Sequence, residues 1–127
     1  MQLELKDGLL FTTVTLTYQG ARLDIPHVLI DTGSATTVLS ADTVAGIQLV
    51  PSAHDVLRTI RGVGGSEVVF VRVVDLLTVG ESSLPQFEIE VGGMEYGFEI
   101  NGILGMDFLV GTGALINSRA MEIEFAA

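Results

Sequence analysis

A chain of 127 residues is long enough for one hydrophobic core, and we expect residues 1–127 to form a single domain. Hydrophobic residues make up 48% of the chain and charged residues 17%, which excludes a disordered polypeptide. The formal charge of −10 argues against nucleic acids and anionic membrane surfaces as partners, because both would repel it. The absence of Cys excludes disulfides, thiolate zinc sites and a Cys nucleophile.

The first residues lack the basic and then apolar pattern of a signal peptide. No apolar run approaches the roughly 20 residues that a membrane-spanning helix needs. We therefore expect a cytoplasmic protein.

Strict alternation of apolar and polar residues predicts strands with one buried face. This alternation occurs in Met1–Leu5, Thr13–Thr17 and Met121–Phe125. Gln19-Gly20 predicts a hairpin turn into a strand at Arg22–Pro26. Because unpaired strand edges invite pairing, we expect the two terminal segments to form a sheet between subunits.

The middle of the chain reads as short strands separated by turns. Val28–Ile30 is a continuous apolar run, which is typical of a strand buried on both faces. A helical turn is expected at Ala41–Ala45, with Ser40 as its N-cap. The other predicted elements are strands at Val38–Ser40, Thr59–Arg61, Ser66–Val74, Leu76–Val79, Phe87–Val91 and Gly102–Gly105, a short helix at Met106–Val110 and a turn at Gly111–Gly113.

The strongest chemical signal is Asp31-Thr32-Gly33-Ser34, directly after the apolar run. An Asp at this place lies at the mouth of a turn, on a strand that is locked in the core. Gly33 lets the backbone approach a neighbour, and the hydroxyls of Thr32 and Ser34 can orient the carboxylate. Taken alone, an Asp-Thr-Gly triplet is more often an ordinary turn.

Two further segments favour a functional site over an ordinary turn. Gly62-Val63-Gly64-Gly65 fails as a phosphate loop because no Lys follows it and Glu67 would repel a phosphate. It also fails as a dinucleotide fingerprint, because Glu67 stands where the third Gly belongs. A glycine-rich hairpin tip can instead serve as a mobile cover over a cleft. The other segment, Ile103–Leu109, would by itself be read as a core strand followed by a helical turn.

The order of these three segments resembles the retropepsin-like aspartic proteases, in their cellular and bacterial branch. Asp31–Thr37 matches the active-site loop of the family, Gly62–Gly65 its flap tip and Ile103–Leu109 the segment that enters its C-terminal helix. The resemblance covers nearly the whole chain. It implies an all-β, closed barrel-like acid-protease fold with one short C-terminal helix.

The resemblance also implies a function and a set of site residues. The expected activity is that of an aspartic endopeptidase acting on polypeptides, a homodimer whose active site shares one Asp31 from each subunit. Asp31, Thr32 and Gly33 are the implied catalytic residues. The implied substrate-binding residues are Ser34, Ala35, Gly62, Val63, Gly64 and Gly65.

The chain departs from the retroviral pattern at two positions. Retroviral enzymes usually carry Asp where this chain has Ala35 and Arg where it has Met106, and these residues form an ion-pair network near the dimer interface. That network is absent here.

No metal or cofactor is expected, because neither His27 nor His54 has a partner at metal-ligand spacing. Two other readings stay open. One is an inactive peptide-binding or dimerisation module of the same fold. The other is a structural β domain in which Asp-Thr-Gly is only a turn.

Overall fold

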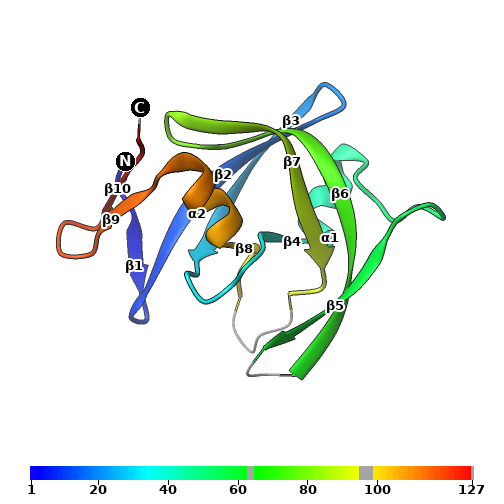
Figure 1. Cartoon of the computed structure of the whole chain (residues 1–127), viewed down its shortest axis with the longest axis horizontal. Helices are drawn as coiled ribbons and strands as arrows, with labels where there is room; N and C mark the ends of the chain where they lie inside the picture. The colour runs from blue at the N-terminus through cyan, green and yellow to red at the C-terminus, as the bar shows by residue number, and fades with distance from the viewer. Residues whose placement is uncertain (63–64, 95–98, 127) are drawn as a thin grey trace.

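Six strands close into a ring in the computed structural model, which describes residues 1–62, 65–94 and 99–126. Around the ring, the strands are β2 (Leu9–Tyr18), β3 (Ala21–Ile30), β8 (Gly102–Leu104), β4 (Val38–Ser40), β7 (Ser82–Gly92) and β6 (Gly65–Val79). Pairing of β2 with β6 closes the ring, while β1 (Glu4–Lys6) and β5 (Leu57–Gly62) flank it (Figure 1). The predicted all-β, barrel-like fold is confirmed.

The alternation along β2 produces the buried side of this ring. Val14 and Leu16 are fully buried, whereas Thr13 is exposed and Thr15 and Thr17 are only partly buried. The predicted turn at Gln19-Gly20 joins β2 to β3, and both residues have positive φ angles, 49° and 81°. A turn with two positive φ angles matches the twist of the strands that it connects.

One strand, β6, replaces two predicted ones. The sequence predicted separate strands on either side of Asp75, but the structure runs through Asp75 as an exposed residue. The strand is long because it has three partners: β5 at its start, β7 along most of its length, and β2 near its end.

Besides the strands, the described residues form two α-helices and one 3-10 turn. The predicted helical turn is present as α1 (Ala41–Val44), followed by η1 (Ala45–Ile47). Ser40 stands at the N-cap position of α1, but its side chain makes no capping hydrogen bond. The predicted C-terminal helix is α2 (Met106–Thr112), which ends at Gly113.

The two ends of the chain pair with each other. β9 (Leu115–Asn117) and β10 (Glu122–Glu124) form a hairpin, and the amide of Leu3 donates to the carbonyl of Met121 at 2.7 Å. Figure 1 shows both termini on the same side of the molecule. Both edges of β10 are thus occupied within one chain. The predicted sheet between subunits would have to use the outer edges of β9 and of residues 1–3, and it stays a prediction.

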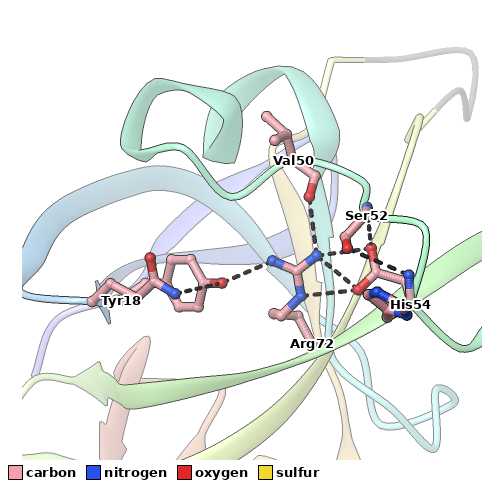
Figure 2. A network of polar contacts seen from close by, with 7 residues as sticks. Tyr18, Val50, Ser52, His54 and Arg72 are labelled. Atoms are coloured by element: carbon pink, nitrogen blue, oxygen red, sulfur yellow. Dashed lines mark hydrogen bonds and ion pairs between the residues drawn. The ribbon is translucent and has the colours of Figure 1, made fainter.

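A polar network holds the segment between η1 and β5 against the sheet (Figure 2). Arg72 on β6 donates two hydrogen bonds of 2.8 Å to the two carboxylate oxygens of Asp55, a third of 2.8 Å to the hydroxyl of Tyr18, and one of 3.0 Å to the carbonyl of Val50. The Asp55 side chain is only 8% exposed. The hydrogen bonds from Arg72 lower the pKa of Asp55 below its usual value of 3.8.

We expect this network to make stability depend on acid pH. A carboxylate whose pKa is lowered by folding contributes stability above its usual pKa, and that contribution disappears as the pH falls through the lowered value. The wild type should therefore lose more thermal stability between about pH 5 and pH 2 than Asp55→Asn, which has no such proton to take up. Thermal melts over this range test the expectation. Asp75→Asn changes an exposed carboxylate on β6, and its melting temperature should depend on pH as that of the wild type does. The same pH dependence of the melting temperature in all three proteins would contradict the expectation.

Candidate active site

Asp31 follows the last residue of β3, where the chain leaves the ring. Its amide donates to the carbonyl of Leu104 at the end of β8, with an N–O distance of 3.0 Å. β3 and β8 run parallel, with Leu29 opposite Ile103 and Ile30 opposite Leu104. The backbone of Asp31 is therefore fixed by a core strand, while its side chain is half-buried.

The backbone of Gly33 orients the carboxylate of Asp31. The Gly33 amide donates to Oδ1 at 2.9 Å, and a Cβ atom at Gly33 would lie 3.1 Å from the same oxygen. The sequence assigned this role to the hydroxyls of Thr32 and Ser34. In the structure Ser34 Oγ donates instead to the carbonyl of Thr36 at 2.7 Å, and Thr32 is exposed. A tight turn brings the amide two residues ahead nearer to the carboxylate than either hydroxyl.

The start of α2 contacts the loop Asp31–Thr37 from the other side. The amide of Met106 donates to the carbonyl of Ser34 at 2.8 Å, and the amide of Asp107 donates to that of Ala35 at 3.3 Å. Gly105 permits this approach, because a Cβ atom there would lie 2.2 Å from the carbonyl oxygen of Thr36. The two segments that the sequence singled out, around Asp31 and around Gly105, are thus in direct contact.

The carboxylate of Asp107 fixes the far end of the loop. It accepts a hydrogen bond of 2.7 Å from the hydroxyl of Thr37 and one of 3.1 Å from the amide of Thr37. The same hydroxyl accepts from the amide of Gly105 at 3.1 Å, and Thr37 is fully buried. Sequence reasoning did not assign this role to Asp107. The signal for it was the acidic residue in the first turn of a predicted helix that begins directly after Gly105.

The predicted flap is a hairpin of β5 and β6. Its last described pair is Gly62 opposite Gly65, and Gly65 has a φ of 121°, a conformation that favours Gly. Val63 and Gly64, the predicted tip, lie outside the described residues. Ala35, the remaining predicted contact, is exposed on the loop.

A small apolar cluster connects this hairpin with β3, the strand that leads to Asp31. We call it the second cluster; it contains Phe11, Val38, Val69, Met94, Ile100 and Ile103. Ile60 from the hairpin and Leu29, two residues before Asp31, pack against it. Leu29 is only half-buried, so the prediction that Val28–Ile30 is buried on both faces holds fully for Val28 alone. The β5–β6 hairpin and the strand leading to Asp31 thus share one apolar surface.

The histidines have local roles. The His27 ring stacks on Phe11 with a centroid distance of 4.2 Å, and the amide of His54 donates to Ser52 Oγ at 3.4 Å. The described residues contain no group of three or more His, Cys, Asp or Glu placed to hold a metal ion. In the same part of the chain, no helix has the length and apolar character needed to cross a membrane.

Comparison with known families agrees with this geometry. The sequence model of a retropepsin-like family described as aspartyl protease matches residues 14–108, which is more than half of the chain. The matched range contains Asp31, the β5–β6 hairpin and Gly105. No curated protein matches the chain.

Proposed function

The chain belongs to the aspartyl protease family, and from that premise we propose that it is an endopeptidase whose active form is a homodimer with Asp31 of each subunit at a shared site. The observation that carries the proposal is the placement of Asp31. Its carboxylate is half-buried at the end of a core strand and oriented by the Gly33 amide, and its loop is held by α2. An ordinary surface turn does not need such support.

The chemistry requires a second carboxylate. One carboxylate takes a proton from the attacking water, while a protonated one polarises the scissile carbonyl. Asp31 lies in the one Asp-Thr-Gly triplet of the chain. A two-fold axis beside Asp31 would supply its partner. Because two adjacent carboxylates resist ionising together, the pair would keep one proton and titrate as a unit.

The surroundings of Asp31 favour an extended polypeptide with apolar side chains as substrate. Leu29 and Ile60, which flank the second cluster, are only partly buried and offer apolar surface between the strand of Asp31 and the hairpin. Burying apolar substrate side chains there would contribute binding energy in proportion to the area removed from water. The β5–β6 hairpin is the element that would cover the bound peptide.

Digestion of a peptide library over a range of pH tests this proposal. We expect cleavage at bonds flanked by apolar residues, and inhibition by a statine-type mimic of the tetrahedral intermediate. The rate should follow a bell-shaped, mildly acidic profile, because one proton must stay on the pair.

Two outcomes would contradict the proposal. A rate that keeps rising to about pH 9 would indicate a different catalytic group. Peptides that bind without being cleaved at any pH would favour the inactive peptide-binding module instead.

A further inference from the structure

Glu90 on β7 is a carboxylate with two unusual properties, burial and contact with the loop of Asp31. Its side chain is 3% exposed. Its Oε1 accepts a hydrogen bond of 2.5 Å from the hydroxyl of Thr36, and its own amide donates to the carbonyl of Thr37 at 3.0 Å. A buried carboxylate is costly unless its oxygens are hydrogen-bonded. The loop of Asp31 provides one of the bonds that make this burial possible.

The other carboxylate oxygen of Glu90 contacts the hairpin. Arg58 on β5 places Nη1 3.4 Å from Glu90 Oε2 and 3.1 Å from Glu88 Oε2. In the sheet, β6 lies between β5 and β7, so the Arg58 side chain crosses β6 to reach both acids. The hydrogen bonds that Arg58 donates to Glu88 and, to a smaller extent, to Glu90 raise the pKa of Arg58, which remains a cation.

These contacts form one continuous polar connection from the hairpin to the loop. We propose that Glu90 is a positioning residue that ties the β5–β6 hairpin to the loop carrying Asp31, so that the cover and the carboxylate keep a fixed relative placement. The kinetic part of this inference rests on the proposed peptidase function. The structural part, that Glu90 restrains the loop, does not.

Glu88 provides a matched control. It lies two residues before Glu90 on the same strand and binds the same Arg58 nitrogen, but its side chain is 50% exposed and it makes no hydrogen bond to the loop among the described residues. Glu88→Gln therefore weakens the pairing with Arg58 and leaves the loop contact intact. A role of Glu90 in surface charge alone would make the two positions equivalent.

Hydrogen exchange tests the restraint on the loop. Glu90→Met removes both hydrogen bonds of the carboxylate while keeping a side chain of similar length. We expect the amides of Gly33 and Thr37 to exchange at least about tenfold faster in this variant, as loss of a hydrogen bond to a charged group implies. Glu88→Gln should leave both rates unchanged. Equal rates in the wild type and Glu90→Met would overturn the inference.

Kinetics test the consequence for the reaction. With a peptide from the library digest, Glu90→Met should lower kcat about tenfold or more and change KM little, because a displaced Asp31 fails in the chemical step. Glu90→Gln restores an acceptor for Thr36 and should recover much of this loss, whereas a purely structural role would lower Tm in both variants without changing kcat of the folded protein. If Glu90→Met does not fold, Thr36→Val removes the loop contact alone and should lower kcat in the same way.

A double-mutant cycle tests the connection between the hairpin and the loop. Arg58 and Thr36 each bind a different oxygen of Glu90. We expect the effects of Arg58→Met and Thr36→Val on kcat/KM to deviate from additivity by at least about threefold. Strictly additive effects of the two substitutions would show that Glu90 does not connect the hairpin to the loop. If the wild type cleaves no peptide while Glu90→Met still loosens the loop, the peptidase proposal fails and the restraint by Glu90 stands.

Discussion

Replacing Gly105 with Ala is expected to destabilise the chain by about 3 kcal/mol, the upper part of the range for overpacked sites. The added Cβ would lie 2.2 Å from the carbonyl oxygen of Thr36 and 3.0 Å from that of Ser34. Both contacts are with backbone, which cannot turn away as a flexible side chain would. Relief of the clash requires α2 to move off the loop, which would stretch the hydrogen bonds that Met106 and Thr37 make across this contact.

Thermal melts measure this effect. For a chain of this size the loss corresponds to a drop in Tm of about 10 °C. Gly46→Ala is the matched control, because a Cβ atom at Gly46 would meet nothing within 4 Å, and it should stay within about 0.5 kcal/mol of the wild type. Peptidase activity should fall with Gly105→Ala even below its Tm, since the displaced loop carries Asp31. Equal melts for the two variants would show that α2 and the loop do not meet closely.

The features that the sequence predicted well are local ones. The alternation around Val14 and Leu16, the turn at Gln19-Gly20 and the apolar run before Asp31 each depend on neighbouring residues in the chain. The position of Asp31 at the end of a core strand could therefore be predicted before the fold was known. The ring of strands followed from the family resemblance, because periodicity alone does not specify which strands pair.

The features that the sequence did not predict depend on contacts between distant segments. Asp107 binds Thr37 across 70 positions of sequence, and Glu90 binds Thr36 across 54. No local pattern marks either acid, because each becomes a partner of the loop only after β7 and α2 have packed beside it. The hydrogen bond from the Gly33 amide to the carboxylate of Asp31 was missed for a related reason. The sequence shows which donors are available, and the geometry of the turn selects the amide of Gly33.

The edges of the sheet also depend on contacts that the local sequence does not specify. Met1–Leu5 and Met121–Phe125 were predicted to form a sheet between subunits, and that prediction remains untested. The partner was not predictable, since an unpaired edge attracts any compatible strand, whether from its own chain or from another. The structure pairs residues 1–3 with β10 of the same chain.

The proposed sharing of the active site leads to the second large expected effect. If each site takes one Asp31 from each subunit, Asp31→Asn in one subunit should stop catalysis in the dimer. Asn has nearly the same size and can keep the turn, but it cannot ionise. The remaining carboxylate cannot act as base and as acid in the same transition state. We expect a loss of at least about a hundredfold, the lower end of what a positioned acid or base provides.

The most direct measurement uses two copies fused through a flexible linker of about 15 residues, which spans roughly 20 Å. The fusion fixes the stoichiometry, so that one copy can carry Asp31→Asn while the other remains wild type. The wild-type fusion should cleave peptide, and the half-mutant should lose at least about a hundredfold in kcat while melting at the same temperature. A half-mutant that keeps about half of the activity would show that each copy owns a complete site, and the shared pair of carboxylates would be wrong.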